Sequence, residues 1–201
     1  MDNCGIHIVP IRNGSEVMGG KVVVVIGTSH AGKSSFVRNT FVRGRTGELN
    51  RDLMPYTEFD DCILIGRYDT GEKRRDGTDS VERKQVGNFA QQVLNLLPKN
   101  KTIVLEGMRC VSRPMMNKLL ENGVDVGIIW IHISPETSFA RNQTFGNKLT
   151  LEQAKRIDTT CRNFVRDFKD KVNIVALNTE HVLDFATFSV NSLNGATSFV
   201  V

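Results

Sequence analysis

The stretch Val22-Val-Val-Val-Ile-Gly-Thr-Ser-His-Ala-Gly-Lys-Ser-Ser35 decides the fold class of this chain. Its first part, Val22–Ile26, is a short β-branched run that stops at a glycine, as a buried strand does. Side chains that suit a buried helix face then recur at helical spacing, at Phe36, Val37, Thr40 and Phe41. The glycine-rich segment between them therefore joins a predicted strand directly to a predicted helix.

The segment Gly27–Ser34 matches the pattern G-x-x-x-x-G-K-[ST], the phosphate-binding P-loop. Its glycines let backbone N–H groups curl around a polyphosphate, and the helix N-terminus adds positive potential. In this pattern Lys33 reaches the β- and γ-phosphates and Ser34 holds Mg²⁺. We therefore predict that ATP and Mg²⁺ bind here, with nucleotide contacts from Gly27, Thr28, Ser29, His30, Ala31, Gly32, Lys33, Ser34 and Ser35.

The composition is that of an ordinary globular protein. The chain has 201 residues, of which 40% are hydrophobic and 24% charged, so we expect a single domain over 1–201. Its net charge of +4 is compatible with a nucleic acid partner without requiring one.

Several classes of protein are not expected. The longest apolar runs, Val22–Ile26 and Gly127–Ile133, are far too short to span a bilayer, and the first residues lack a secretory signal pattern. The four cysteines are scattered and form no C-x-x-C pair, which argues against a zinc site and suits reduced thiols. We therefore expect a cytoplasmic protein, in the host cytoplasm if the chain is viral.

Strand and helix patterns alternate along the chain. This alternation predicts an α/β fold with a parallel sheet that is covered by helices on both faces. An Asn-Gly pair predicts a hairpin within residues 1–20, and a loop is expected from Gly44 to about Thr57. The predicted strands are Val22–Ile26, Cys62–Arg67, Thr102–Glu106, Val126–Ile133 and Val172–Leu177. The predicted helices after the first are Ser80–Leu97, Arg113–Glu121, one that starts at Pro135, and Leu151–Asp170.

Polar side chains follow the predicted strands at their carboxyl ends, where such sheets bind their ligands. They are Arg67, Asp69, Glu106, Arg109 and Ser134. Glu106 ends an otherwise apolar strand, so we predict that it is the carboxylate that lies near Mg²⁺ or its waters.

The segment Gly66–Asp79 is long, polar and punctuated by glycines. Asp69 or Asp79 is a candidate for orienting an acceptor hydroxyl, but Asp79-Ser-Val-Glu82 also reads as a capping box for the next helix. The segment carries candidate phosphate ligands for an acceptor at Arg67, Lys73, Arg74 and Arg75.

A cluster of arginines lies in the helical region after the fourth predicted strand. Phosphoryl transfer benefits from an arginine that neutralises charge on the moving group, and Arg141 is the candidate. The loop Phe145–Lys148 is placed to bend over a nucleotide.

The whole pattern resembles the P-loop nucleoside and nucleotide kinases, particularly the thymidylate-kinase-like group. The resemblance rests on Gly27–Ser34, on Ile103-Val-Leu-Glu-Gly107 and on Ile131-His-Ile-Ser-Pro-Glu-Thr-Ser-Phe-Ala-Arg141. It implies a three-layer P-loop kinase fold with a five-stranded parallel sheet, helices on both faces and a lid at about 137–165. It also implies that Lys33, Glu106, Asp69 and Arg141 are the catalytic residues.

A narrower resemblance comes from Ile65-Gly-Arg-Tyr-Asp69 and Gly77-Thr-Asp-Ser80. These segments are similar to viral kinases that phosphorylate 5-hydroxymethyluracil already in DNA, a step in thymidine hypermodification in bacteriophage genomes. The resemblance implies a DNA substrate that carries the modified pyrimidine. A free (deoxy)nucleoside monophosphate is the alternative acceptor, and a nucleotide-dependent DNA-binding module is the alternative without catalysis. The implied substrate contacts are Arg67, Tyr68, Asp69, Arg75, Thr78, Asp79 and Arg109.

Overall fold

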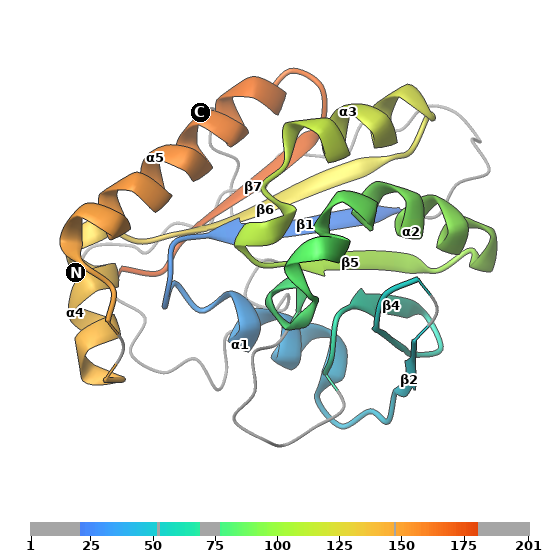
Figure 1. Cartoon of the computed structure of the whole chain (residues 1–201), viewed down its shortest axis with the longest axis horizontal. Helices are drawn as coiled ribbons and strands as arrows, with labels where there is room; N and C mark the ends of the chain where they lie inside the picture. Colours follow the sequence, from blue (N-terminus) through green and yellow to red (C-terminus); the bar gives the residue numbers. More distant parts are fainter. Residues whose placement is uncertain (1–20, 52, 69–76, 147, 181–201) are drawn as a thin grey trace.

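The computed structural model describes residues 21–51, 53–68, 77–146 and 148–180. All five predicted strands are present and lie parallel to one another in one sheet (Figure 1). They are β1 (Val22–Gly27), β4 (Cys62–Ile65), β5 (Thr102–Glu106), β6 (Val126–His132) and β7 (Asn173–Asn178).

The prediction of a five-stranded, wholly parallel sheet is wrong in its count, because the sheet has seven strands and is mixed. The strand order is β2-β3-β4-β5-β1-β6-β7. Strands β2 (Glu48–Asn50) and β3 (Tyr56–Glu58) lie in the segment that was expected to be a loop, and they pair antiparallel with each other and with β4. Each has three residues, which is too short for an alternating pattern to be recognised, so their pairing with the rest of the sheet defines them.

Helices cover both faces of the sheet, as predicted (Figure 1). One face packs against α2 (Phe89–Leu96), α3 (Arg113–Glu121) and α5 (Leu151–Phe168), and the other packs against α1 (Lys33–Val37). Strand β1 serves both layers, because successive side chains of a strand point to opposite faces. Val22, Val24 and Ile26 join the first core, whereas Val23 and Val25 join the second.

The helix predicted over Ser80–Leu97 is only partly correct. Its first half consists of two 3-10 turns, Thr78–Ser80 and Arg83–Asn88, and the α-helix begins at Phe89. The capping prediction for Asp79 is wrong, because Asp79 lies inside the first turn and neither turn has a side-chain cap. The remaining helices agree more closely: α3 has the predicted bounds, α4 (Pro135–Thr144) starts at the predicted proline, and α5 ends two residues early.

Two further predictions, the hairpin in residues 1–20 and part of the polar segment before Gly77, lie outside the described residues. Among the helices of the described ranges, none combines the length and the apolar character that crossing a bilayer requires.

The strand order positions the site. The chain runs from β1 to β4 and β5 on one side of β1, and then to β6 and β7 on the other side. In open α/β sheets ligands bind at the carboxyl ends of the strands where the order reverses in this way. Here that point is the carboxyl end of β1, where the Gly27–Ser34 loop begins.

Candidate functional site

The Gly27–Ser34 loop joins the carboxyl end of β1 to the first turn of α1, as the sequence predicts. Gly27 has a φ of 153°, and a Cβ atom there would lie 2.0 Å from the Ile131 carbonyl oxygen, so only glycine fits beside β6. The Lys33 ammonium donates a hydrogen bond to the Thr28 carbonyl oxygen at 2.8 Å. The lysine side chain is therefore held against its own loop in this structure.

Glu106, the last residue of β5, faces the start of α1. Only 2% of its surface is exposed, and the Ser34 hydroxyl lies 3.3 Å from each of its carboxylate oxygens. The Tyr68 hydroxyl donates to Oε2 at 3.1 Å. A serine of the Gly27–Ser34 loop and a strand-end carboxylate thus lie in contact although they are 72 residues apart in the sequence. Tyr68, which we predict to contact the substrate, also orients this carboxylate.

The segment that starts at Gly77 forms the next wall of the site. The Thr78 hydroxyl donates to the Glu106 carbonyl oxygen at 2.8 Å. A Cβ atom on Gly77 would lie 2.5 Å from Glu106 Oε2, so a larger residue would displace the carboxylate. Gly77 also forms an isolated antiparallel bridge with Arg67. The two ends of the polar segment, at Arg67 and at Gly77, therefore lie side by side next to Glu106.

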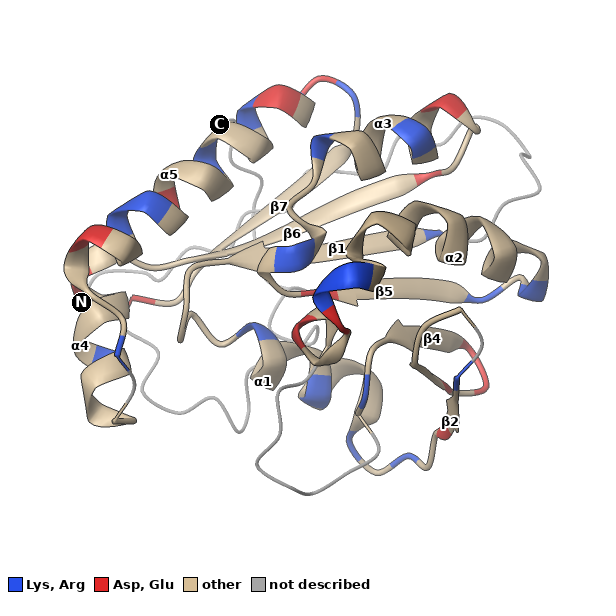
Figure 2. Ribbon diagram, viewed as in Figure 1, with Lys and Arg blue, Asp and Glu red and all other residues tan. Residues whose placement is uncertain are grey.

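Two arginines in this wall each have a buried nitrogen without a hydrogen-bond partner in the described part of the chain: Nε of Arg67 and Nη1 of Arg109. The Arg109 side chain pairs with Asp79, with Nε 3.9 Å from Oδ1. Figure 2 shows Lys, Arg, Asp and Glu residues close together in the segment ahead of α2 and just after β5. A buried donor that lacks a partner costs free energy, which an anionic ligand would recover.

Helix α4 and the residue after it contact the loop as well. Arg141 donates from Nη1 to the His30 carbonyl oxygen at 3.4 Å and from Nη2 to the carbonyl oxygens of Thr179 and Glu180 at 3.0 and 3.2 Å. The Phe145 ring is 70% exposed and stacks on the His30 ring, with centroids 5.1 Å apart. Burial, followed by the charges of Lys33 and Arg141, lowers the pKa of His30.

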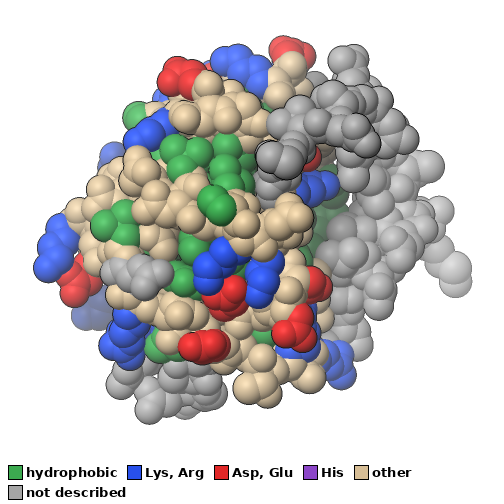
Figure 3. All heavy atoms as spheres, turned by 90° about the vertical axis from the view of Figure 1, so that its right-hand side faces the viewer, with side chains coloured by type: hydrophobic (Ala, Val, Ile, Leu, Met, Phe, Trp, Pro, Cys, Tyr) green, Lys and Arg blue, Asp and Glu red, His purple; other side chains and the backbone are tan. Residues whose placement is uncertain are grey.

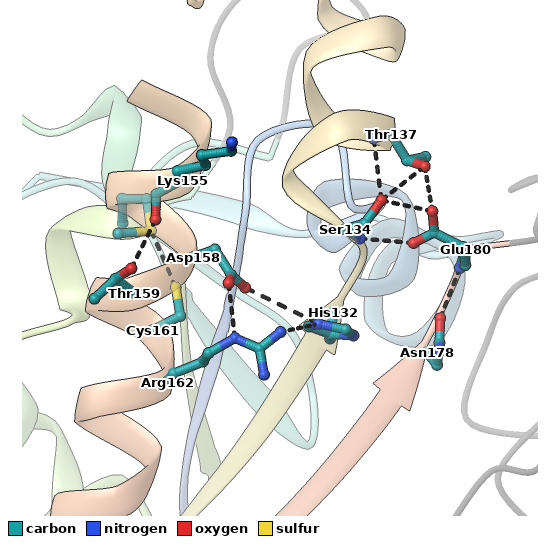
Figure 4. Close-up of polar contacts among 11 residues, drawn as sticks. His132, Ser134, Thr137, Lys155, Asp158, Thr159, Cys161, Arg162, Asn178 and Glu180 are labelled. Atoms are coloured by element: carbon teal, nitrogen blue, oxygen red, sulfur yellow. Dashed lines mark hydrogen bonds and ion pairs between the residues drawn. The ribbon is translucent and has the colours of Figure 1, made fainter. Parts of the chain in front are cut away.

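The region predicted as a lid, at about 137–165, comprises most of α4 and most of α5. Figure 4 shows how this region is attached to the sheet. Glu180 accepts hydrogen bonds from the Ser134 amide, the Ser134 hydroxyl and the Thr137 hydroxyl at the start of α4. Ser134 is therefore the helix cap of α4, since its own hydroxyl also accepts from the Thr137 amide at 3.1 Å.

Helix α5 is attached to β6 through His132. Arg162 bonds the buried Asp158 through Nε at 2.7 Å and lies 2.7 Å from His132 Nε2 through Nη2 (Figure 4). Burial and then Arg162 lower the pKa of His132, against the opposing charges of Asp158 and Glu180. This cluster links elements of the fold and contains none of the predicted site residues.

The described residues bring together most of the predicted site. Arg67, Tyr68, Thr78, Asp79, Glu106 and Arg109 lie in the wall beside the loop, whereas Asp69, Lys73, Arg74 and Arg75 lie outside the described residues. Sequence reasoning missed Ser138 and Thr179, whose hydroxyls donate to carbonyl oxygens of the loop. Thr179 directly follows the last apolar strand, and its place at a strand end could have marked it as a site residue. No comparable feature of the sequence marks Ser138.

The side-chain oxygen atoms at the site are ligands of the kind that a hard cation prefers. Mg²⁺ takes oxygen ligands and usually binds one or two carboxylates together with substrate phosphates and water. Ser34 Oγ and the Glu106 carboxylate supply such oxygens in one place. Among the described residues, no group of three or more His, Cys, Asp or Glu side chains forms a metal cage, and a Mg²⁺–phosphate site does not need one.

Comparison with protein-family models and with curated proteins finds no match to this chain. The site is therefore interpreted from its own geometry.

Proposed function

We propose that this chain is a Mg²⁺-dependent kinase with the three-layer P-loop kinase fold. In this proposal the γ-phosphate of ATP moves to the hydroxymethyl group of 5-hydroxymethyluracil in DNA. The observation that carries the kinase assignment is the contact between Ser34, at the end of the glycine-rich loop, and the buried Glu106 at the end of β5. Phosphoryl transfer needs such a phosphate cradle beside a carboxylate.

The loop amides and Lys33 bind the phosphates of ATP, which requires the Lys33 ammonium to exchange its contact with the Thr28 carbonyl for a phosphate oxygen. Ser34 and Glu106 would hold Mg²⁺, directly or through water, and the ion supplies positive charge to the phosphates when it is bound. Arg141, which lies against the loop, is the candidate for neutralising charge on the group that moves, which requires Nη2 to exchange its contacts with the Thr179 and Glu180 carbonyl oxygens for a phosphate oxygen.

The reaction is a displacement at phosphorus. The acceptor hydroxyl oxygen forms a bond to the γ-phosphorus while the bond from that phosphorus to the bridging oxygen of ADP breaks. The hydroxyl proton passes to a carboxylate, and the candidates are Glu106 and Asp69. Tyr68 and Thr78 hold Glu106 in place, because they bond its carboxylate and its carbonyl oxygen, respectively.

The acceptor part of the proposal rests on the resemblance of Ile65–Asp69 and Gly77–Ser80 to viral DNA-base kinases. Two observations support it. These segments lie next to Glu106, and Arg67 and Arg109 each present a buried N–H that suits a phosphate oxygen. Asp79 and Arg75 complete the proposed contacts. A base within duplex DNA must leave the stack to reach such a site.

Incubation with ATP labelled at the γ-phosphate tests the proposal. Four parallel reactions contain hydroxymethyluracil DNA, the same DNA with thymine, free hydroxymethyl-dUMP and free dTMP. We expect label in the hydroxymethyluracil DNA only, and no label with Lys33→Ala. If a free monophosphate is labelled faster than the hydroxymethyluracil DNA, the DNA acceptor is wrong and the chain is a nucleoside monophosphate kinase instead. ATP binding without transfer to any acceptor would indicate a binding module instead.

A further inference from the structure

Three consecutive carbonyl groups of the Gly27–Ser34 loop are each bonded by a side chain from a distant part of the chain. Ser138 Oγ donates to the Ser29 carbonyl oxygen at 2.8 Å, and Thr179 Oγ1 donates to the Ala31 carbonyl oxygen at 2.9 Å. Between them, Arg141 Nη1 donates to the His30 carbonyl oxygen at 3.4 Å. The donors come from α4 and from the residue after β7.

The two hydroxyl donors are completely buried. Ser138 and Thr179 both have 0% exposed surface, and the bond from Thr179 to Ala31 is buried at both ends, so water does not compete for that bond. The partners are 109 and 148 residues apart in the sequence, and the bonds therefore exist only because the sheet order brings α4 and the end of β7 to the loop. Buried carbonyl oxygens need a partner, but that need alone does not require side chains on three successive residues.

Because the peptide bond is planar, the direction of these three carbonyl groups also determines the direction of the N–H groups that follow them. In a trans peptide unit the C=O of one residue and the N–H of the next point in opposite directions. Holding the carbonyls of Ser29, His30 and Ala31 on the side of α4 and β7 directs the amides of the next three residues away from that side, where the Ala31 amide bonds the Thr28 carbonyl oxygen at 3.4 Å. The side chains thus determine where a row of backbone dipoles points before any ligand binds.

We infer that Ser138 and Thr179, with Arg141 between them, are positioning residues that orient the loop peptides for a polyphosphate. The inference rests on the proposed nucleotide-binding function. The loop dipoles are already aligned when the anion arrives, so less binding energy is spent on ordering the loop. His30, with a φ of 56°, shows that a non-glycine residue of this loop is held in the left-handed region. We call Ser138, Arg141 and Thr179 the carbonyl clamp.

Isosteric substitution of Thr179 tests the carbonyl clamp. Thr179→Val keeps the volume and removes the hydroxyl, whereas Thr179→Ser keeps the hydroxyl. The dissociation constants of ATP and of inorganic tripolyphosphate, both with Mg²⁺, are measured by calorimetry at 25 °C on the full chain. We expect Thr179→Val to weaken both by about tenfold and Thr179→Ser to stay within about twofold of the wild type, as the loss of one buried hydrogen bond allows.

A control separates positioning from stability. Ile128→Val, in the buried part of β6, lowers the unfolding midpoint without touching the loop, and we expect it to leave both dissociation constants unchanged. If Thr179→Val does not fold, Ser138→Ala takes its place in the same measurement. Wild-type affinities in the folded variant would overturn the carbonyl clamp and leave the kinase proposal standing. A wild-type chain that binds neither ATP nor tripolyphosphate would overturn the kinase proposal, and the clamp with it.

Discussion

The sheet has a carboxyl end, where its five parallel strands finish, and an amino end, where they begin. A glutamate lies at each of these ends, and the two carboxylates have different partners. At the amino end, Glu58 of β3 lies between Lys99 and Lys101, whose Nζ atoms are 2.5 and 2.9 Å from its oxygens. Figure 3 views the molecule from this end and shows cationic and anionic side chains close together. At the carboxyl end, Glu106 accepts hydrogen bonds from the hydroxyls of Ser34 and Tyr68.

Under the proposed function, the difference separates a carboxylate that stabilises the fold from one that takes part in phosphoryl transfer. Burial alone would raise the pKa of Glu58, but the hydrogen bonds from Lys99 and Lys101 outweigh it and hold that pKa below its usual value. The two ammonium groups thus stabilise the negative charge of the Glu58 carboxylate. The hydroxyl bonds of Glu106 orient its carboxylate without adding positive charge. We therefore expect substitutions at the carboxyl end to change activity and those at the amino end to change only stability.

The largest effect is expected from Lys33→Ala. It removes the cation of the loop, and we expect the rate of phosphoryl transfer to fall by about 10²–10³-fold or more, as for other charge-stabilising donors. Circular dichroism should show an unchanged fold, because the Lys33 ammonium bonds the Thr28 carbonyl oxygen of its own loop. The matched control is Lys101→Ala at the amino end, which should transfer phosphate at the wild-type rate. Near-normal turnover in Lys33→Ala would refute the kinase assignment.

Glu106→Gln compares the two glutamates directly. The amide keeps a hydrogen-bond acceptor for Ser34 and Tyr68 but loses the charge, so we expect kcat to fall by about 10²-fold, with little change in ATP affinity. Glu58→Gln is the control and should leave kcat unchanged. Steady-state kinetics and calorimetry measure the two quantities. A tenfold loss of ATP affinity with an unchanged kcat would show that Glu106 serves binding alone.

Phe145→Ala tests a smaller effect within the carboxyl end. Phe145 covers the His30 ring, and burial is the largest cause of the lowered pKa of His30. Removal of the phenyl ring should therefore raise that pKa toward 6.5, while Lys33 and Arg141 continue to oppose the rise. Titration of the His30 ring protons by NMR measures the shift. An unchanged pKa would mean that Phe145 does not contribute to the burial of His30.

The smallest effect is expected from Glu58→Gln on stability. The pKa of Glu58 is lower in the folded protein than its ordinary value of 4.5, so its ion pairs stabilise the fold above that pH. The variant should lose about 1 kcal/mol or less of unfolding free energy at pH 7, as is usual for pairs near solvent. The difference from the wild type should shrink as the pH falls below 4.5. Urea denaturation at pH 7 and near pH 4 gives both values, and a difference that grows toward acid would contradict the ion-pair account.

Much of the sheet was predictable from local sequence. The five parallel strands are apolar runs bounded by polar residues, and a buried strand in a parallel sheet has that pattern whatever its neighbours are. The short strands β2 and β3 were not predictable, because three residues show no periodicity. The 3-10 turns ahead of α2 were missed because Val81, Phe89 and Val93 fit helical spacing across the irregular part.

The sequence by itself determined the strand–loop–helix unit around Gly27–Ser34 and the presence of a carboxylate at the end of β5. Both depend on residues that are adjacent in the chain, so their physics is local. Only the tertiary structure decided that Glu106 meets Ser34 and that Ser138 and Thr179 bond the loop. These contacts join residues that are 72 to 148 positions apart in the sequence. The order of the strands in the sheet brings such residues together, and the residue pattern within a single segment does not depend on that order.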